Sequence, residues 1–483
     1  MVHKSLRSYI DILKDQIIET NEMCDICDKA IITQVSYNSM DVKPGTLFIC
    51  KGANFKEEYL DSAIEKGAVC YLADKMMRND VPAIIVKDIR ESLSIASAHM
   101  YDHIWNDKLT EIGITGTKGK STTTCFIKSI LDCAQSNGKT AVVSGIYNYD
   151  GNKKEKAILT TPETIELHKI LSNSIENGCD KLVMEVSSQG LKYKRVEDLK
   201  YKIGVFLNIG VDHISETEHE SFEDYFNSKL ELFKHCEIAC INVDIEEKYL
   251  YRILDEAIAN KCRIVTFGTR QVAHYRGSLV EDKIDGLTFE MFYSGILTTL
   301  KTSIGGYYNM INALAAIAVC KELGVSIKDI EEGLRKAKIP GRMEIFNVPN
   351  KDAKIIVDYA HNEMSYNSLF ESINRNYPDY KKMFMFGCAA DKAFNRRNEA
   401  AKIAEKEADK VIITKYDDGK ESFDEICKSI LRYISPDKDV KVFNHREEAI
   451  KYCLDNAQNG WIIILAGCET DAEIVKEYLK RCY

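Results

Sequence analysis

The stretch that decides the fold is Ile112-Gly-Ile-Thr-Gly-Thr-Lys-Gly-Lys-Ser-Thr-Thr-Thr124. It opens with a short apolar run that is typical of a buried strand. A helix is predicted from Thr122 onward, with an inner face made of Phe126, Ile127, Ile130 and Leu131. A Gly-rich turn between a strand and a helix points backbone N–H groups and the positive end of the helix dipole at one spot. That arrangement suits a phosphate group.

Within this turn, Gly116 and Gly119 let the backbone approach an anion closely. Lys120 can reach the β- and γ-phosphates, and the Ser121 hydroxyl can bind Mg²⁺. The strict phosphate-loop spacing requires a glycine where this chain has Ile114, so the motif is a shortened variant. The alternative is an ordinary Gly-rich turn, but the lysine and hydroxyl after the second glycine favour phosphate. We therefore expect the chain to bind a nucleoside triphosphate.

Composition narrows the class of protein. The 483 residues are enough for about three domains of ~150 residues. A net charge of −9 argues against a general nucleic-acid binder. The N-terminus lacks a signal-peptide core and no long apolar run follows, so we expect a cytoplasmic protein without membrane insertion. The 16 cysteines are scattered, and the single C-x-x-C pair, Cys24 and Cys27, is weak support for zinc. We expect reduced cysteines.

The pattern of apolar runs predicts an α/β protein with three domains. Residues 1–108 read as a small α/β domain. In residues 109–338 predicted strands alternate with helices, a pattern typical of a mostly parallel sheet with helices on both faces. This part ends in a predicted β insertion at 275–305 and a helix at 310–323. Pro340-Gly341 marks a boundary, and residues 339–483 read as a second doubly wound domain.

Polar residues follow the predicted central strands, where ligands of open α/β sheets bind. Glu185 closes one strand, Asn208 closes the next, and His213 comes soon after. A carboxylate and an imidazole at this edge could hold Mg²⁺. A buried glutamate and a solvated histidine remain an equal alternative. Other polar positions also have a purely structural interpretation: Thr160–Glu163 as a helix start, Ser187 as a helix cap, and Arg342 as a linker residue.

Eight stretches along the chain carry a further signal. In chain order they are Thr115-Gly-Thr-Lys-Gly-Lys-Ser-Thr122, Thr160-Thr-Pro-Glu163, Met184-Glu-Val-Ser-Ser188, Asn208 with Asp212-His213, Phe222-Glu-Asp-Tyr-Phe226, Asn309 with Asn312, Pro340-Gly-Arg-Met-Glu344 and Val357-Asp-Tyr-Ala-His-Asn362. Taken together and in this order, they resemble the Mur ligases, the ATP-dependent amide-forming enzymes of peptidoglycan synthesis. Within the family, the chain looks most like the lysine-adding enzymes.

The resemblance implies the three-domain α/β fold of that family. Residues 1–108 would bind the UDP end of the substrate, 109–338 would form a phosphate-loop ATPase-like parallel sheet, and 339–483 would form a Rossmann-like domain for the amino acid. The implied reaction is ATP-dependent addition of the third amino acid to UDP-MurNAc-L-Ala-D-Glu through an acyl phosphate. The implied partners are this UDP-linked dipeptide and a free amino acid, with ATP and Mg²⁺ as cofactors, and we expect a monomer.

Site residues follow from the same resemblance, position by position. The implied catalytic set is Lys120, Glu185, His213 and Lys229, and Lys229 matches a lysine that family members carbamylate. The implied metal ligands are Ser121, Glu185, His213 and Lys229. ATP would be bound by Gly116, Thr117, Lys118, Gly119, Lys120, Ser121, Thr122, Asn312, Arg342 and Asp358. The muramyl-peptide and the amino acid would be bound by Ser39, Thr160, Thr161, Ser187, Arg195, Asp417 and Asp471.

Departures from the family pattern concern the acceptor amino acid. Enzymes that add diaminopimelate carry Asp-Asn-Pro-Arg, where this chain has Lys415-Tyr-Asp-Asp-Gly419. Acidic Asp417 and Asp418 would suit an ammonium group, so we expect L-lysine. A Gly-Lys-Gly motif becomes Gly467-Cys-Glu, although Asp471 keeps an acidic position. Ligation of another diamino acid such as ornithine, and a degenerate paralogue that binds nucleotide without ligation, remain the alternatives. The folate-polyglutamating ligases share the ATP core but fit the 160–163 and 184–188 stretches less well.

Overall fold

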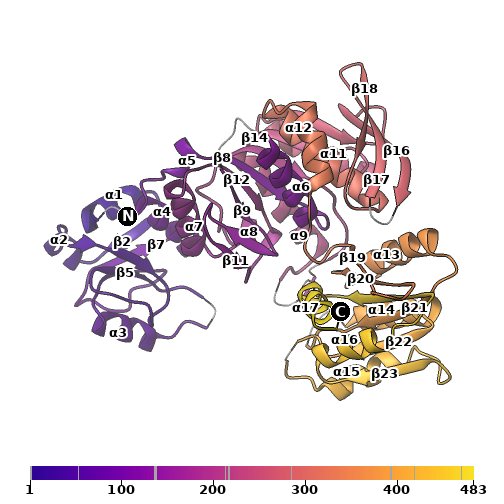
Figure 1. Cartoon of the computed structure of the whole chain (residues 1–483). Coiled ribbons are helices and arrows are strands. Elements are labelled where there is room, and N and C mark those ends of the chain that lie inside the picture. Colours follow the sequence, from indigo (N-terminus) through magenta and orange to yellow (C-terminus); the bar gives the residue numbers. More distant parts are fainter. Residues whose placement is uncertain are drawn as a thin grey trace. The chain divides into compact units, whose positions relative to one another are not determined.

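The structure is a computed structural model of the 483-residue chain. It describes residues 3–52, 54–134, 139–212, 214–215, 218–283, 286–391, 394–417, 419–468 and 470–482. The chain divides into two compact units, Met1–Thr124 with Ala134–Thr266, and Cys125–Cys133 with Phe267–Tyr483. Each is a mixture of helices and strands (Figure 1). The predicted His213 and Asp418 lie outside the described residues.

The first unit begins with a five-stranded sheet of order β2-β7-β6-β5-β4, parallel except for the β2–β7 pair. Alternate residues of its strands are buried against different helices. Leu47 and Ile49 join the core that α1 and α4 cover, while Phe48 packs with Leu60 of α3. A sheet buried on both faces explains the continuous apolar runs in its sequence. The elements are β1 (Lys4–Ser5), α1 (Leu6–Leu13), β2 (Ile17–Thr20), α2 (Met23–Ile26), β3 (Ile31–Ile32), β4 (Gln34–Ser36), β5 (Thr46–Ile49), α3 (Glu57–Glu65), β6 (Ala68–Ala73), β7 (Ala83–Val86) and α4 (Ile89–His99).

The larger sheet of the first unit has the strand order β11-β10-β9-β12-β8-β13-β14-β15. Strands β9, β12, β8, β13 and β14 are parallel, as predicted, whereas β10 and β11 add an antiparallel hairpin that the sequence pattern did not predict. The elements are α5 (Trp105–Lys108), β8 (Thr110–Thr115), α6 (Lys120–Cys133), β9 (Lys139–Val143), β10 (Tyr147–Tyr149), β11 (Lys154–Lys156), α7 (Thr164–Glu176), β12 (Cys179–Glu185), α8 (Ser188–Lys192), β13 (Tyr201–Phe206), α9 (Phe222–Leu230), a 3-10 turn (Glu231–His235), β14 (Cys236–Asn242), α10 (Glu247–Ala259) and β15 (Arg263–Gly268).

Helix α6 follows the phosphate loop. It begins at Lys120, two residues earlier than predicted, and Phe126, Ile127, Ile130 and Leu131 are fully buried, as expected. The second half of α6 belongs to the second unit. There the backbone of Ile130 lies so close to Gly333 that a Cβ on the glycine would come within 2.4 Å of the Ile130 Cα. This close approach explains why the helix that packs against α6 has a glycine at this position.

The second unit opens with the antiparallel strands β16–β18, which confirm the predicted β insertion, followed by two helices. Residues Phe267 and Gly268 at the end of β15 pair with β16. The elements are β16 (Tyr275–Lys283), β17 (Gly286–Tyr293), β18 (Ile296–Lys301), α11 (Tyr307–Glu322) and α12 (Ile327–Lys336).

The rest of the second unit is a six-stranded sheet of order β19-β20-β24-β21-β22-β23, in which only β19 is antiparallel. Helices α13, α14 and α15 cover one face, and α16 and α17 cover the other. The elements are β19 (Glu344–Asn347), β20 (Ala353–Asp358), α13 (Glu363–Asn376), β21 (Lys381–Phe386), α14 (Asn395–Glu407), β22 (Lys410–Thr414), α15 (Phe423–Leu431), β23 (Asp439–Phe443), α16 (Arg446–Asp455), β24 (Trp461–Ala466) and α17 (Asp471–Cys482).

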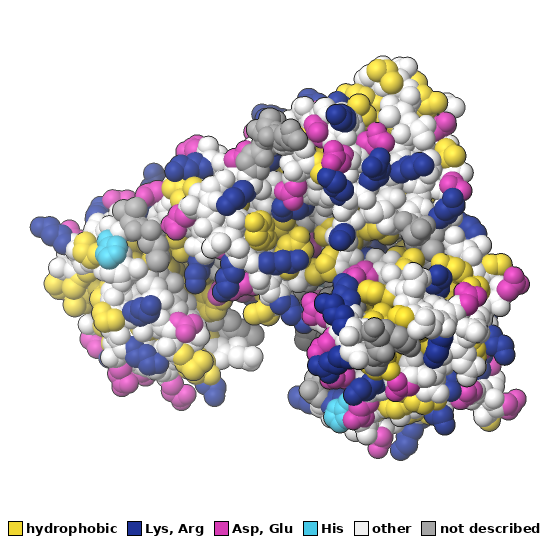
Figure 2. All heavy atoms as spheres, viewed as in Figure 1, with side chains coloured by type: hydrophobic (Ala, Val, Ile, Leu, Met, Phe, Trp, Pro, Cys, Tyr) yellow, Lys and Arg dark blue, Asp and Glu magenta, His cyan; other side chains and the backbone are white. Residues whose placement is uncertain are grey.

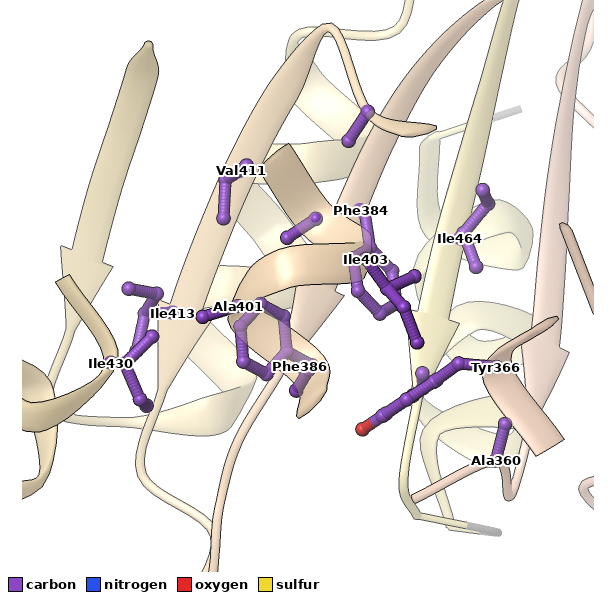
Figure 3. Packing of buried hydrophobic residues seen from close by; sticks show 14 of the residues in the cluster. Ala360, Tyr366, Phe384, Phe386, Ala401, Ile403, Val411, Ile413, Ile430 and Ile464 are labelled. Atoms are coloured by element: carbon purple, nitrogen blue, oxygen red, sulfur yellow. The ribbon is translucent and has the colours of Figure 1, made fainter. Parts of the chain in front are cut away.

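An aromatic and β-branched core holds the first face of this sheet. Tyr366 of α13 makes an edge contact with Phe384 of β21, and Phe384 stacks on Phe386, with ring centroids 5.4 and 5.0 Å apart. Figure 3 shows these rings between Val411, Ile413 and Ile430 on one side and Ile464 on the other. The apolar runs that predicted β21, β22 and β24 are therefore buried, whereas the edge strand β23 is largely exposed.

The surface is mixed in charge. Figure 2 shows Lys and Arg side chains interspersed with Asp and Glu side chains over the described part of the face in view. Among the described residues, no helix combines the length and the apolar composition that a membrane crossing needs. Every cysteine whose side chain is described is free of disulfide bonds.

Candidate active site

The phosphate loop joins β8 to α6. Gly116 has φ +151° and Gly119 has φ +86°, conformations that favour glycine. A Cβ at position 116 would lie 2.9 Å from the Cβ of Leu207 and 3.3 Å from the backbone nitrogen of Asn208. The first glycine of the motif therefore serves two needs, an unusual backbone conformation and the close approach of the neighbouring strand end.

Asn208 fixes this loop from the end of β13. Its Oδ1 accepts a hydrogen bond from the Lys118 backbone N–H at 2.9 Å, and its Nδ2 donates to the Lys118 carbonyl at 3.0 Å. The Thr117 N–H donates to the Asn208 carbonyl at 3.2 Å. The Thr117 hydroxyl also shares a hydrogen bond of 3.0 Å with the hydroxyl of Tyr225. The sequence indicated Asn208 only as a polar residue at a strand end, and its pairing with the loop is a result of the fold.

Two lysines converge on the loop. The Nζ of Lys120 donates to the Gly116 carbonyl at 2.8 Å. The Nζ of Lys229, on α9, donates to the same oxygen at 3.1 Å and lies 4.7 Å from the centre of the Tyr225 ring. Lys229 is 1 % exposed. Burial, followed by the nearby charge of Lys120, lowers the pKa of Lys229 well below its usual value.

Glu185 ends β12 beside the loop. It is 2 % exposed, and its Oε1 accepts a hydrogen bond from the Gly145 N–H at 2.9 Å. The Thr115 hydroxyl donates to the Val186 carbonyl at 2.8 Å, which ties the ends of β8 and β12 together. Glu185 is thus a buried carboxylate at the edge of the sheet that carries the phosphate loop.

The donors present fit Mg²⁺. This ion commonly binds through one or two carboxylates, with phosphate oxygens and water completing its octahedron. Glu185 supplies a carboxylate, and Ser121 supplies a hydroxyl in the first turn of α6. Within the described ranges, no three His, Cys, Asp or Glu side chains form a metal-binding group by themselves, and His213 lies outside those ranges. A magnesium ion here would depend on phosphate oxygens.

A second group of predicted residues lies against Glu185. The Thr161 hydroxyl donates to the Glu185 carbonyl at 3.0 Å and accepts from the Ser187 N–H at 2.9 Å. Arg195 Nη1 donates to the Thr161 carbonyl at 3.2 Å. Thr161, Ser187 and Arg195 are therefore neighbours, and Thr160 lies beside them, where its Oγ1 would be 3.2 Å from a Cβ at Gly145.

Several of these residues also have structural roles. Ser187 caps α8, since its hydroxyl accepts a hydrogen bond from the Gly190 N–H at 3.0 Å. The cap reading of Ser187 thus holds alongside its place next to Thr161. The backbone carbonyl of Ser39, after β4, accepts a hydrogen bond from Lys66 at 2.8 Å, and none of the contacts between described residues brings Ser39 to the Thr161 group.

In the second unit, the structure brings Arg342 and Asp358 together. The Arg342 guanidinium lies 4.7 Å from the centre of the Tyr359 ring, and Asp358 accepts hydrogen bonds from the N–H groups of Met343 and Ala360. Burial raises the pKa of Asp358, and the charge of Arg342 opposes that rise. Separately, Asn312 on α11 is buried, and its Nδ2 donates to the Asn309 Oδ1 at 3.2 Å.

The two acidic residues predicted for the amino-acid site are engaged with protein groups. Asp417 Oδ1 accepts from the Ala390 N–H at 2.8 Å. Asp471 is 0 % exposed, and both of its oxygens bind Arg446, at 2.8 Å from Nε and 2.6 Å from Nη2. Direct contact between Asp471 and a bound amino acid would require this buried ion pair to open. No sequence motif indicates Arg446 as its partner.

The loop of β8, its lysine, and the buried carboxylate beside it define an enzyme that binds a nucleotide at the edge of a parallel sheet. The profile of the Mur ligase middle domain matches residues 114–320, and that of the Mur ligase glutamate ligase domain matches residues 341–468. The chain therefore belongs to the Mur ligase family, ATP-dependent enzymes that form peptide bonds.

Curated relatives cover nearly the whole chain. The UDP-N-acetylmuramoyl-L-alanyl-D-glutamate–L-lysine ligase of Enterococcus faecalis is 34% identical over 93% of this chain and 89% of its own. The UDP-N-acetylmuramyl-tripeptide synthetase of Limosilactobacillus reuteri is 38% identical, covering 93% and 94% of the two chains. A 2,6-diaminopimelate ligase of the same kind from Clostridium acetobutylicum is 34% identical, covering 94% and 95%.

Solved structures show the same fold. A UDP-N-acetylmuramoyl-L-alanyl-D-glutamate–2,6-diaminopimelate ligase superposes with a TM-score of 0.70 at 21% identity, covering 99% of both chains. The MurF ligase of Thermotoga maritima, in complex with ADP, gives a TM-score of 0.63 at 18% identity, covering 93% of this chain and 98% of its own. The predicted α/β fold of the family is confirmed.

Proposed function

We propose that this ATP-dependent ligase adds the third amino acid to UDP-MurNAc-L-Ala-D-Glu in peptidoglycan synthesis. One observation carries the proposal: the hydroxyl of Thr161 bonds the backbone of Glu185, so the group of Thr161, Ser187 and Arg195 adjoins the phosphate-loop edge of the sheet. Hydroxyl and guanidinium donors next to a phosphate site suit an anionic peptide whose carboxylate is to be phosphorylated. The relatives named above carry this activity in their names.

ATP would lie on Gly116–Thr122, with Lys120 beside its terminal phosphates. Mg²⁺ would be held by Ser121 and Glu185, a second ion by His213, and both would offset the charge of the phosphates. Buried Lys229 favours the neutral amine, the form that reacts with CO₂ to give a carbamate. A carbamate would turn a buried amine beside the Gly116 carbonyl and the Thr115 hydroxyl into an anionic metal ligand.

The reaction follows from these positions. The terminal carboxylate of the dipeptide attacks the γ-phosphorus, the bond to ADP breaks, and an acyl phosphate forms. The amine of the incoming amino acid then attacks the acyl carbon, and inorganic phosphate leaves with the loss of a proton from nitrogen. Lys120 stabilises charge on the transferred group, and the substrate-binding residues hold the carboxylate in line.

We assign the three predicted segments to three roles. Residues 1–108 would bind the UDP end, with Ser39 near the uridine, and residues 109–338 would bind ATP, with Asn312 at the adenine. Residues 339–483 would bind the amino acid, with Arg342 at phosphate and Asp358 at the ribose. Since ATP and UDP-linked precursors are cytoplasmic metabolites, the enzyme would act in the cytoplasm. We expect it to act as a monomer.

L-lysine is the proposed acceptor. The segment Lys415–Gly419, which stands in place of the Asp-Asn-Pro-Arg of diaminopimelate enzymes, ends in Gly419, and a Cβ there would lie 2.4 Å from the Ala390 Cβ and 2.5 Å from Asp391 Oδ2. A side chain at this position has no room, so a gripping arginine is excluded without backbone movement. Asp417 lies in the same segment and would face the side-chain ammonium.

The test is amino-acid-dependent release of phosphate from ATP in the presence of UDP-MurNAc-L-Ala-D-Glu and Mg²⁺, with L-lysine, L-ornithine and meso-diaminopimelate compared. Release with lysine alone supports the proposal. Release with ornithine or diaminopimelate instead would show that this amino acid, and not lysine, is the acceptor. ATP binding without release for any amino acid would support the degenerate paralogue, which the buried Asp471–Arg446 pair favours as the second candidate.

A further inference from the structure

Lys51, just after a strand of the N-terminal sheet, contacts the segment that carries Thr161, one of the proposed substrate-binding residues. It follows β5, and its side chain is 11 % exposed. Its Nζ lies 2.5 Å from Glu163 Oε2 and 4.2 Å from the centre of the Tyr37 ring. Burial lowers the pKa of Lys51, and Glu163 opposes that shift. Lys51 is therefore a nearly buried cation whose partner is a residue at the start of α7.

Glu163 joins two cations. Its other oxygen, Oε1, lies 2.5 Å from Arg195 Nη2, and the Glu163 side chain makes no capping hydrogen bond to α7 although it occupies the cap position. Each carboxylate oxygen thus serves one cation. Because each oxygen is bound to a different cation, Glu163 is held in one position by both.

This division of oxygens leaves Arg195 with donors to spare. Its Nη2 binds Glu163, its Nη1 donates to the Thr161 carbonyl, and its Nε is buried with no hydrogen-bond partner in the described part of the chain. The residue is 8 % exposed. A buried N–H without a partner is costly, and an anionic ligand would satisfy it.

Arginine and carboxylate groups prefer a bidentate pair. With Lys51 on Oε2, Arg195 reaches one oxygen only. Without Lys51, Oε2 would be open to Arg195, and a bidentate pair would draw the guanidinium toward Glu163 and away from Thr161. Lys51 thus determines the orientation of the Arg195 guanidinium.

Further contacts keep Lys51 in register with this group. The Tyr37 hydroxyl donates to Glu166 Oε1 at 2.7 Å, and Lys194 Nζ lies 3.0 Å from Asp88 Oδ2. Ile165 of α7 packs against the core of the N-terminal sheet. The sheet that carries Lys51 and the segments that carry Glu163 and Arg195 are therefore fixed to each other within the first unit.

We propose that Lys51 is a positioning residue: by occupying one oxygen of Glu163, it holds the Arg195 guanidinium and the 160–163 segment in the geometry that binds the UDP-linked peptide. The inference rests on the proposed function, in which Arg195 and Thr161 bind that substrate. It goes beyond it by making a residue of the N-terminal sheet a determinant of substrate affinity without contact to the substrate.

The experiment measures equilibrium binding of UDP-MurNAc-L-Ala-D-Glu and, separately, of a non-hydrolysable ATP analogue with Mg²⁺. We expect Lys51→Met to weaken binding of the UDP-linked dipeptide about tenfold and to leave the nucleotide Kd within twofold. Lys51→Arg should restore most of the affinity. Lys87→Met, at an exposed lysine of the same sheet whose Nζ binds a backbone carbonyl, is the matched control and should change neither Kd.

A double-mutant cycle separates positioning from direct contact. If Lys51 acts through Glu163, Lys51→Met should change the dipeptide Kd by less than twofold in a Glu163→Gln background. An undiminished effect in that background, or an unchanged Kd in Lys51→Met itself, would overturn the proposal. Should Lys51→Met fold poorly, Lys51→Gln takes its place in the same cycle.

Failure of the proposed function has a different signature. Wild-type protein that binds the UDP-linked dipeptide but releases no phosphate with any amino acid would refute the ligase activity. The positioning role of Lys51 would then still be tested by the Kd values of its variants. Wild-type protein that does not bind the dipeptide would refute both.

Discussion

Lys120 and Lys229 donate to one and the same oxygen, the backbone carbonyl of Gly116, at 2.8 and 3.1 Å. One lysine belongs to the phosphate loop, and the other comes from α9 and is buried. Two ammonium groups so close together repel each other, and this repulsion adds to burial in lowering the pKa of Lys229. The site thus holds two lysines in different surroundings, one of them buried and with a lowered pKa, which the first two predictions address.

Lys120→Ala should lower kcat/KM for phosphate release about a thousandfold, because the γ-phosphate loses the cation that stabilises it during transfer. The fold should persist, because the side chain is only partly buried and donates to two carbonyls of the loop itself, those of Gly116 and Thr117. Steady-state kinetics and circular dichroism check this. Near-wild-type activity would refute the phosphate-loop assignment.

Lys229→Ala should be inactive and should regain part of its activity in short-chain carboxylates such as acetate. A small anion could then enter the space of the buried side chain and replace a carbamate. Activity measured against carboxylate concentration tests this, with Lys234→Ala, an exposed lysine of the following 3-10 turn, as control. Activity that is retained in Lys229→Ala, or lost without any rescue, contradicts a carbamate role.

Asn208→Ala should raise the KM for ATP roughly tenfold to thirtyfold, since it removes two hydrogen bonds to Lys118 worth about 1 kcal/mol each. The KM for the amino acid should stay unchanged. Asn227→Ala, on the exposed side of α9, is the control. Equal ATP KM values in all three proteins would show that the loop keeps its shape without the clamp.

Glu111, on β8, makes stability depend on pH. Burial raises its pKa from 4.5 to about 8, and only Oε2 has a partner in the described part of the chain, the Lys200 N–H at 3.0 Å. Asp198 raises the pKa further and Lys200 opposes. Because the folded state holds the proton more tightly, stability is fully present below pH 4.5 and is lost as pH rises toward 8, at about 1.4 kcal/mol per unit.

Glu111→Gln should therefore melt at a higher temperature than the wild type, by a margin that grows from pH 5 to pH 8.5. Calorimetry at a series of pH values gives this margin. Glu237→Gln, at an exposed glutamate paired with Lys202, is the control substitution measured at the same pH values. A Glu111→Gln margin that does not change with pH would show that the carboxyl group is ionised in the folded protein.

Much of the fold was predictable because buried parallel strands are encoded locally. The apolar runs that end at Glu185, Phe206 and Ala466 lie in strands fully covered by helices, so their sequence shows no alternation and stands out. The hairpin β10–β11 was missed for the converse reason. Lys154–Lys156 is exposed and charged, and it is a strand only because it pairs with β10.

The candidate site was predictable in its residues and not in its contacts. The glycines, lysines and hydroxyls at 116–121 mark a shortened phosphate loop by their residue types and their order. The sharing of Glu163 between Lys51 and Arg195, and the sequestering of Asp471 by Arg446, join charges that the sequence leaves unpaired. Exposed and buried carboxylates look alike in a sequence.

By itself, the sequence determined the phosphate loop, most of the order of strands and helices, and the family, since each depends on residue types at short spacing. Only the tertiary structure decided which charged side chains form ion pairs, which lysine is desolvated, and which carboxyl group has a raised pKa. The physical reason is that pairing and desolvation depend on neighbours brought together by folding, whereas helix, strand and turn preferences act over a few adjacent residues.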